Sequence, residues 1–287
     1  MRIAVTGAAG FTGRHLVRHL AERGDEPVAL VADVTDAGAV KREIADLQPD
    51  AVIHLAAKAF VQSDDVQSFY TVNQIGTVHL LEAIASARSD TTVLLASSAQ
   101  VYGAQASGLI GEDAPLAPSN HYAVSKAAME MASRLYDNRI QLIVARPFNY
   151  TGVGQQDRYL VPKIVSHFAR RAGRIELGNL DVQRDFGDVR ALVSAYAGLL
   201  SAAPGIYNVS SGIVHSVRDL LAILTRLTGH HLIVDVNPAF VRSDDVPVLG
   251  GRNDRLRTAL PGWQPRPIEE TLIWMLSHSA MALDTLA

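Results

Sequence analysis

Short apolar runs alternate with segments of helical apolar spacing through the first half of the chain. The runs occupy residues 3–5, 28–31, 52–55, 93–95 and 142–144. Between them, apolar residues recur three or four positions apart, as at Leu81 and Ile84. Continuous apolar runs are typical of strands buried on both faces, and helices between them supply the crossovers of a parallel sheet. We therefore predict an α/β fold with a doubly wound parallel sheet.

The pattern becomes less regular after residue 150, with Pro, Gly and Arg clustered over 151–188. Further on, Ser216 is followed three positions later by Asp219, which is the pattern of a helix N-terminus. The helix that starts there should end at Gly229, because glycine readily takes the left-handed conformation at a C-cap. The C-terminal third is therefore predicted to be a smaller lobe of mixed structure.

Composition narrows the classes of function. The chain has 287 residues, of which 48% are hydrophobic and 19% charged, and no cysteine. Disulfides, thiolate metal sites and cysteine nucleophiles are thus excluded. Basic and acidic residues, 26 and 29 in number, are interspersed and give a net charge of −3, so no basic surface for nucleic acid is expected. No apolar run approaches membrane-spanning length, and glycines interrupt the apolar N-terminus, so we expect a cytoplasmic protein.

A glycine-rich loop follows the first predicted strand directly and opens the first predicted helix. Its glycines, Gly7, Gly10 and Gly13, have the spacing Gly-x-x-Gly-x-x-Gly. Such glycines allow a tight turn and a close approach of the backbone to a pyrophosphate, at which the helix N-terminus then points. No Lys-Ser or Lys-Thr pair follows, so the loop is not a P-loop. The sequence therefore predicts a dinucleotide site on a Rossmann-type sheet.

Asp33 lies where a carboxylate can accept hydrogen bonds from the adenosine ribose of such a dinucleotide. A carboxylate would repel a 2′-phosphate, and no basic residue occurs between Gly24 and Lys41. These two observations favour NADH over NADPH within an NAD(P)H cofactor. The alternative is that Asp33 only caps the following turn or helix.

A tyrosine and a lysine four residues apart, Tyr122 and Lys126, would share one face of a helix. A nearby cation stabilises a phenolate and lowers the pKa of the phenol, which suits the tyrosine for acid–base chemistry. Upstream, Ser97 and Ser98 follow the fourth predicted strand, where hydroxyls emerge at the carboxyl edge of a parallel sheet.

Together these motifs resemble the extended short-chain dehydrogenases/reductases of the nucleotide-sugar epimerase/dehydratase group. The matching segments occur in family order over nearly the whole chain; besides the glycine loop they are 54–57, 73–77, 97–103, the Tyr122–Lys126 pair and 146–149. Residues 146–155 and 178–186 are similar to the GDP-mannose 4,6-dehydratases and, more closely, to the GDP-4-dehydro-6-deoxy-mannose reductases.

The resemblance implies a role for each matching residue. Tyr122 would be the proton donor or acceptor, Lys126 its partner, and Ser98 the hydroxyl that orients the sugar oxygen. The residues expected at the cofactor are Gly7, Gly10, Phe11, Thr12, Gly13, Asp33, Val34, Leu55, Ala56, Ala57, Asn73, Ser97, Tyr122 and Lys126. Those expected at the nucleotide-sugar substrate are Ser98, Gln100, Asn149, Arg184 and Arg242. Simple ion pairs, of Arg184 with Asp185 and of Arg242 with Asp244 or Asp245, are the alternatives for the two arginines.

The residues after Ser98 select among the reactions of the family. Dehydratases carry a glutamate, often preceded by an aspartate, where this chain has Ala99 and Gln100. Neither side chain exchanges protons at neutral pH, which disfavours dehydration. The double epimerase-reductases use a cysteine there, and this chain has none. Reduction of the 4-keto group of an NDP-4-keto-6-deoxy-hexose remains, with GDP-D-rhamnose or GDP-6-deoxy-talose as products. A nucleotide-sugar 4-epimerase with bound NAD and a non-catalytic dinucleotide sensor are the alternatives.

The resemblance also implies an organisation of the molecule. Residues 1–148 would form the dinucleotide-binding domain, to which about 186–211 would return, and 149–287 would form most of the substrate-binding lobe. Helices near 74–87 and 122–137 would pair with those of a second copy in a homodimer. His15 and His19 have metal-ligand spacing on a helix but no apparent third ligand, so no metal site is predicted.

Overall fold

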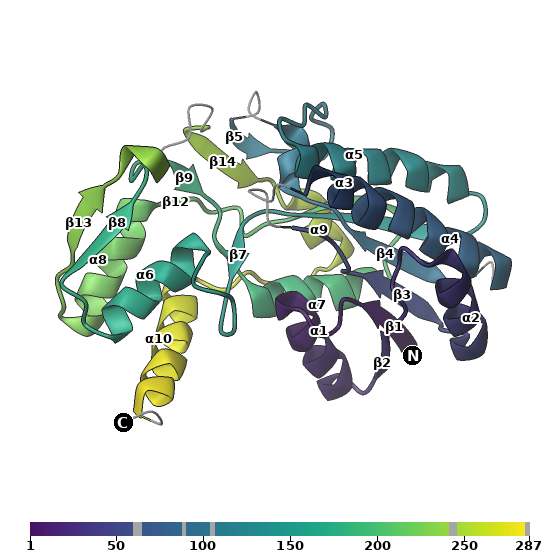
Figure 1. Ribbon diagram of the computed structural model, residues 1–287, viewed down its shortest axis with the longest axis horizontal. Helices are drawn as coiled ribbons and strands as arrows, with labels where there is room; N and C mark the ends of the chain where they lie inside the picture. The colour runs from purple at the N-terminus through teal and green to yellow at the C-terminus, as the bar shows by residue number, and fades with distance from the viewer. Residues whose placement is uncertain (60–64, 88–89, 104–106, 241–245, 285–287) are drawn as a thin grey trace.

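The computed structural model describes residues 1–59, 65–87, 90–103, 107–240 and 246–284, with side chains described as far as residue 279. Arg242 lies outside these ranges. Figure 1 shows a sheet covered by helices and, beside it, a lobe that contains α6, α8, β8 and β13. These two parts are built mainly, but not wholly, from the first and second halves of the chain.

The central sheet has six parallel strands in the order β11-β6-β4-β3-β1-β2. Its strands are β1 (Arg2–Thr6), β2 (Glu26–Leu30), β3 (Ala51–His54), β4 (Thr92–Ala96), β6 (Gln141–Pro147) and β11 (Gly205–Val209). Central strands such as β3 are buried along their whole length. Their apolar runs therefore need cover on both faces, as the sequence predicts.

Helices cover both faces of this sheet. On one face, Leu16 and Leu20 pack with Ile3 and Val5 of β1; this face carries α1 (Phe11–Glu22) and α7 (Val189–Leu199). The other face has its own apolar core and carries α2 (Ala37–Leu47), α4 (Gly76–Ala87) and α5 (His121–Ser133). A parallel sheet between two helical layers confirms the predicted fold class.

Short elements lie in the connections around the central sheet. They are α3 (Val66–Ser68), η1 (Phe69–Ile75), η2 (Ala99–Tyr102), β5 (Gly108–Ile110), η3 (Arg134–Tyr136), β7 (Tyr150–Thr151) and β10 (Gly187–Asp188). Of these, β7 and β10 pair in parallel. The η1 helix continues directly into α4, and this helical segment places Asn73 beside the loop that follows the carboxyl end of β3.

The lobe has a separate apolar core around Phe168 and Leu220. Its elements are α6 (Leu160–Ala169), β8 (Arg174–Leu177), β9 (Gln183–Arg184), β12 (His215–Ser216), α8 (Val217–Thr228), β13 (Ile233–Val236), η4 (Pro238–Phe240), β14 (Val248–Gly251) and α10 (Ile268–Asp284). Helix α9 (Asp254–Ala259), from the same half of the chain, packs instead against the central sheet. Ser216 and Asp219 form a reciprocal capping box at α8, and Gly229 is its C-cap at φ 63°, which confirms the predicted ends of this helix.

Two segments connect the parts more closely than their order in the chain suggests. β5, from the first half, pairs in parallel with β14 of the second half. The second half of the chain also contributes to the sheet domain, because Leu256 of α9 and Trp263 pack into the core of the central sheet. The sequence predicts such a return only for about 186–211. The Trp263 indole donates to the Ala191 carbonyl of α7 at 2.9 Å, which fixes this return.

Candidate active site

The glycine loop lies at the point where the order of the sheet reverses. The chain passes from β1 to β2 on one side and then back across β1 to β3 on the other, so the loops after β1 and β3 meet at the carboxyl edge. Gly7 has φ +66°, and a Cβ there would lie 2.9 Å from the backbone N of Ala56. A Cβ on Gly13 would lie 2.3 Å from the carbonyl O of Gly7.

These contacts explain why the loop needs glycine at its first and last positions. Gly10 is the N-cap of α1, and its N–H donates to the Gly7 carbonyl at 3.0 Å. The cap has no side-chain hydrogen bond, so the first turn of α1 keeps donor groups for a ligand. A side-chain-free turn at a helix N-terminus fits the pyrophosphate of a dinucleotide.

A buried row of side chains holds the loop after β3 beside the glycine loop. The Thr6 hydroxyl accepts from the backbone N–H groups of Leu55 at 3.1 Å and Ala56 at 3.0 Å, and it hydrogen-bonds to His54 Nδ1 at 2.7 Å. His54 Nε2 in turn hydrogen-bonds to Thr77 Oγ1 at 2.9 Å. Burial lowers the pKa of His54 to about 3, so the imidazole is neutral. The row aligns β1, β3 and α4.

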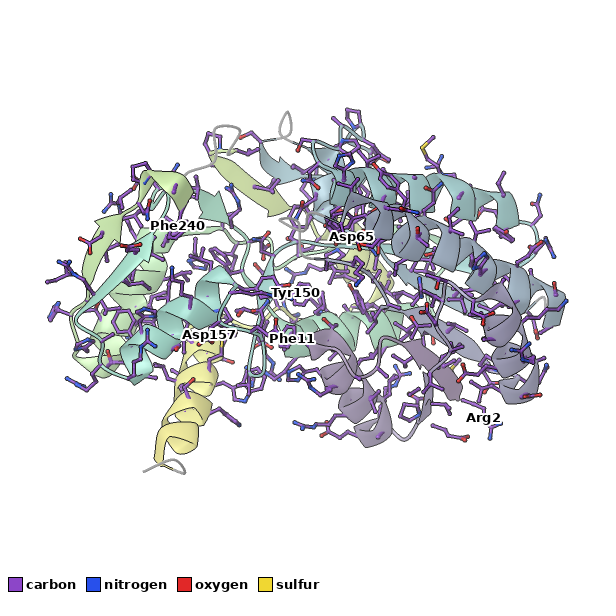
Figure 2. All side chains as sticks on the ribbon, viewed as in Figure 1. Arg2, Phe11, Asp65, Tyr150, Asp157 and Phe240 are labelled. Carbon is purple, nitrogen blue, oxygen red and sulfur yellow. The ribbon has the colours of Figure 1, made fainter. Side chains whose placement is uncertain are left out.

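Phe11 and Thr12 contact a residue that the sequence motifs do not single out, Tyr150 of β7. The Phe11 ring stacks on the Tyr150 ring with centroids 6.1 Å apart, and Thr12 Oγ1 lies 2.9 Å from the Tyr150 hydroxyl. Figure 2 places Phe11 and Tyr150 at the junction of the sheet domain and the lobe. Tyr150 therefore ties the first turn of α1 to the segment that leads into the lobe.

Asp33 is exposed after β2, and its Oδ1 accepts from the backbone N–H of Thr35 at 2.9 Å and from the Thr35 hydroxyl at 2.8 Å. The N-cap of α2 is Asp36 and not Asp33. The hydrogen bonds from Thr35 are the main cause that lowers the pKa of Asp33. The positive charge of Lys58, from the loop after β3, makes a smaller contribution in the same direction. Lys58 is distant from Asp33 in the sequence, and only the fold brings the two side chains close together.

Two of the expected cofactor residues have structural contacts of their own. Val34 is 5% exposed and packs against Gly76, where a Cβ would lie 2.7 Å from Val34 Cγ2. Asn73 is fully buried; its Oδ1 accepts from Lys58 N at 2.8 Å, and its Nδ2 donates to Lys58 O and to Ser125 Oγ at 3.0 Å each. Both amide hydrogens of Asn73 are therefore used to join the β3 loop to α5.

The residues expected to be catalytic converge at the end of β4. Ser98 caps η2, and Tyr122 and Lys126 lie one turn apart on α5. The Ser98 side chain lies near the Tyr122 phenol and acts to lower its pKa. Lys126 is 3% exposed, and its Nζ donates to the Ala96 carbonyl at 2.6 Å. The structure thus brings together the serine, the tyrosine and the lysine.

The pKa of Tyr122 differs from the sequence expectation. Burial raises the pKa of this phenol well above its usual value, and the nearby Ser98 side chain only partly opposes the effect. Lys126 is not among the causes of this shift, because its own pKa is lower than that of the phenol, and it is neutral at the pH where the phenol would titrate. Burial lowers the pKa of Lys126 to about 8, and the negative charge of the nearby Glu130 partly opposes this effect. Tyr122 therefore holds its proton at neutral pH, as a proton donor must.

Ser97 points away from the expected cofactor side and into a buried ionic network. Its hydroxyl donates to the Glu130 carboxylate. Glu130 also forms an ion pair with Arg146 at 2.6 Å, each side chain being 2% exposed, and Arg146 Nη1 donates to the Tyr102 hydroxyl at 3.0 Å. Glu130 follows Lys126 by one helical turn, a spacing that could have marked it as a third member of the same helix face.

The substrate residues lie on both sides of the junction. Gln100 lies in η2, two positions after Ser98, and Asn149 is exposed just after β6. Arg184 lies in β9, and its Nη1 donates to the carbonyls of Gln183 at 2.9 Å and Val246 at 2.6 Å. Asp185 accepts from Ser210 at 2.5 Å and from Ser211 at 2.9 Å. Arg242 is outside the described residues.

The described ranges contain no group of three or more His, Cys, Asp or Glu side chains that could hold a metal ion. They also contain no helix long and apolar enough to cross a membrane. The structure assembles a glycine loop open to a phosphate ligand, a neighbouring serine and tyrosine, and a buried lysine. Such a site can place a proton on, or take one from, an oxygen bound between Ser98 and Tyr122.

Comparison with known proteins places this arrangement in a family. The profile of the family described as GDP-mannose 4,6 dehydratase matches residues 28–275. GDP-6-deoxy-D-talose 4-dehydrogenase of Aggregatibacter actinomycetemcomitans is 36% identical over 268 residues, covering 91% of each chain. GDP-6-deoxy-D-mannose reductase of Pseudomonas aeruginosa is 35% identical over 295 residues, covering 96% of each.

A solved structure gives the same result for the fold. RMD from Pseudomonas aeruginosa, complexed with NADPH, superposes with a TM-score of 0.86 at 33% identity and covers 98% of both chains. The resemblance to the nucleotide-sugar epimerases and dehydratases is thereby confirmed. The chain belongs to the GDP-mannose 4,6 dehydratase family.

Proposed function

We propose that this protein is an NAD(P)H-dependent oxidoreductase that reduces the 4-keto group of GDP-4-dehydro-6-deoxy-D-mannose. The observation that carries the proposal is the residue pair beside the catalytic group: Ala99 and Gln100 follow Ser98, so η2 offers no carboxylate that could remove water from the sugar. The two relatives named above are, by name, a dehydrogenase and a reductase of GDP-6-deoxy sugars, which supports the proposal.

The proposed chemistry divides between the cofactor and the protein. When bound on the glycine loop, the reduced dinucleotide supplies hydride for carbon 4 of the sugar. Ser98 and Tyr122 hold the oxygen of that carbon, and the protonated phenol donates its proton as negative charge develops there. Lys126 supplies positive charge behind the tyrosine, where it offsets the charge that the phenolate acquires.

Product analysis tests the proposal directly. The 4-keto sugar, generated in situ from GDP-mannose, is incubated with enzyme and with NADH or NADPH, and the product is assigned by NMR. We expect oxidation of one dinucleotide per sugar and formation of GDP-D-rhamnose or GDP-6-deoxy-talose. Turnover without consumption of added reduced dinucleotide would contradict the reductase and support a 4-epimerase with bound NAD, the second candidate.

The Tyr122→Phe variant tests the catalytic assignment and separates an enzyme from a dinucleotide sensor. We expect kcat to fall by about 10²- to 10⁴-fold, the usual contribution of a general acid. Fluorescence titration should show that dinucleotide binding persists, because the ring and its packing remain. Unchanged turnover would remove Tyr122 from the mechanism.

The nucleotide diphosphate is assigned to residues at the edge of the lobe. Arg184 and Asn149 support this assignment by their positions in β9 and after β6, and a guanidinium matches phosphate geometry. We propose that residues 1–148 with 186–211 bind the dinucleotide and that 149–287 contribute most of the substrate-binding lobe. Arg184→Ala should raise KM more than it lowers kcat, since it removes a contact remote from the reacting carbon.

The same product assay, run with NADH and with NADPH, measures the cofactor preference. Asp33 favours NADH, whereas Lys58, whose charge acts on Asp33, offers a cation to a 2′-phosphate. We propose Lys58→Ala as the discriminating variant. If the wild type uses NADPH, this variant should raise KM for NADPH and leave that for NADH little changed.

We also propose that the protein is a cytoplasmic homodimer that pairs through α4 and α5. Met131 is 66% exposed and Leu135 is 81% exposed, both on the outer side of the α5 segment. The double variant Met131→Asp/Leu135→Asp should sediment as a monomer. Ile233→Asp, at a residue 59% exposed in the lobe, is the matched control and should leave the mass unchanged.

A further inference from the structure

Asn120 begins α5 and faces Gln100 across the catalytic edge. Asn120 is the N-cap of α5, and its Oδ1 accepts from the backbone N–H of Ala123 at 2.9 Å. A backbone N–H can only donate, so the atom that faces it must be the amide oxygen of Asn120. This contact fixes the orientation of the amide, which is otherwise ambiguous in asparagine.

The fixed amide of Asn120 in turn orients Gln100. Asn120 Nδ2 donates to Gln100 Oε1 at 3.1 Å. Gln100 must therefore present its oxygen to Asn120 and keep its Nε2 group for another partner. Over the described part of the chain, no hydrogen bond of Gln100 Nε2 is found, and Gln100 is only half-buried.

The pair is placed at the reacting centre by two short connections along the chain. Gln100 follows Ser98 by two residues, and its backbone N–H donates to Ser98 Oγ at 3.2 Å. Asn120 precedes Tyr122 by two residues on the first turn of α5. Each member of the pair is thus attached to one member of the Ser98–Tyr122 pair.

We propose that Asn120 is a positioning residue that commits Gln100 to act as a hydrogen-bond donor to the sugar. The ligand must then offer an acceptor oxygen, keto or hydroxyl, at this place, and a sugar that offers only a donor there is disfavoured. The inference deepens the proposed function and rests on it. A neutral donor cannot take a proton from the sugar, so it binds a 4-keto hexose without promoting loss of water.

Two substitutions at Asn120 distinguish positioning from capping. Asp and Ser both cap helices about as well as Asn, so stability should change little in either variant. In Asn120→Asp, the second oxygen can only accept; Gln100 must turn its Nε2 toward it and present Oε1 to the sugar. In Asn120→Ser, the short side chain does not reach Gln100, whose amide then rotates freely.

The expected order of the two variants is the reverse of their similarity to asparagine. Asn120→Asp should lower kcat/KM by about 10- to 100-fold, because a donor is replaced by an opposing acceptor, and Asn120→Ser by only about 3-fold. A residue that served only as a cap would leave kcat/KM nearly unchanged in both variants, since Asp and Ser preserve the cap. Equal activity of the wild type and Asn120→Asp would overturn the proposal.

A double-mutant cycle shows whether the effect passes through Gln100. In a Gln100→Ala background, Asn120→Asp should cost less than about 3-fold, and an undiminished cost would contradict the proposal. Asn138→Asp is the control: it makes the same exchange at an exposed turn position before β6, away from the carboxyl edge, and should leave kcat/KM unchanged.

Binding of GDP-mannose, measured by calorimetry, separates this inference from the proposed function. If the wild type fails to reduce the 4-keto sugar, the proposed reaction is wrong, but the order of the two Asn120 variants in GDP-mannose affinity still tests the pair. If the wild type reduces the sugar while Asn120→Asp binds and turns over normally, the reaction stands and the positioning role is wrong.

Discussion

At the scale of single residues, one face of α5 carries three groups with different tasks. Tyr122, Lys126 and Glu130 follow one another at intervals of one turn. Tyr122 keeps its proton because burial raises its pKa, whereas Lys126 has its pKa lowered to about 8 by the same cause. Glu130 opposes that lowering. The charge of Lys126 at neutral pH thus depends on a carboxylate that the substrate never touches.

This dependence predicts the pH profile of the enzyme. As the pH rises through about 8, Lys126 loses its proton in the free enzyme, and kcat/KM should fall. Tyr122 titrates much higher and does not contribute to this limb. Glu130→Gln removes the carboxylate that raises the Lys126 pKa, so the limb should move toward acid by about 1 pH unit. Initial rates from pH 6 to 10 measure it.

The control for this prediction is Glu82→Gln, at an exposed ion pair with Arg139 on the outside of α4. It should leave the profile where it is. Because Glu130→Gln also leaves Arg146 buried without its counter-ion, circular dichroism must first show that the variant is folded. A folded Glu130→Gln enzyme with an unshifted basic limb would show that Glu130 does not influence Lys126.

At the scale of elements, local sequence patterns predict most of the structure that depends on contacts between neighbouring residues. The capping box of α8, the glycine loop and the apolar strands all depend on neighbouring residues, and each forms as predicted. The pairing of β5 with β14 and the approach of Lys58 to Asp33 depend on contacts between distant segments. No local periodicity encodes such contacts, which is why the sequence missed Lys58 and Tyr150.

The β1–loop–α1 unit gives a prediction at this scale. A methyl group on Gly13 would collide with the backbone of Gly7 and Ala8, neither of which can move without shifting the loop. Gly13→Ala should therefore weaken dinucleotide binding by more than about 10-fold and destabilise the fold by roughly 1–3 kcal/mol. Gly173→Ala, where a Cβ meets nothing within 4 Å, is the control and should behave as the wild type. Fluorescence titration and thermal unfolding measure the two effects.

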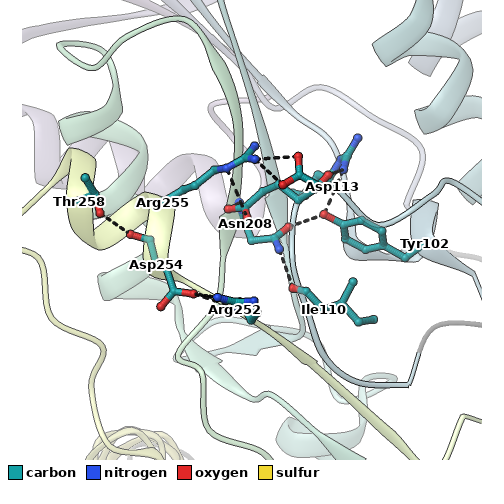
Figure 3. Close-up of polar contacts among 10 residues, drawn as sticks. Tyr102, Ile110, Asp113, Asn208, Arg252, Asp254, Arg255 and Thr258 are labelled. Carbon is teal, nitrogen blue, oxygen red and sulfur yellow. Dashed lines mark hydrogen bonds and ion pairs between the residues drawn. The ribbon is translucent and has the colours of Figure 1, made fainter.

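At the scale of the whole molecule, buried hydrogen bonds fasten η2 and β5 to the edge strand of the sheet, and β5 in turn pairs with β14 of the lobe. Asn208 of β11 is fully buried; it accepts from the Tyr102 hydroxyl at 2.7 Å and donates from Nδ2 to the Ile110 carbonyl at 2.9 Å. Arg255 of α9 reaches Asp113 at 2.7 Å nearby. Figure 3 shows these contacts side by side, joining η2, β5, β11 and α9. The catalytic edge thus shares its supports with the lobe.

The last prediction follows from the central position of Asn208. Asn208→Ala removes one of the two donors to the Ile110 carbonyl, the other being the Arg252 N–H, and it removes the acceptor of the buried Tyr102 hydroxyl. The free energy of unfolding in urea should therefore fall by about 1–3 kcal/mol. Asn138→Ala, at an exposed turn position, should change it by less than about 0.5 kcal/mol. The Tyr102 hydroxyl also accepts a hydrogen bond from Arg146, the ion-pair partner of Glu130. The substitution should therefore disturb the Glu130 network and lower kcat as well. A destabilised variant with wild-type kcat would show that the junction supports the fold but not the active site.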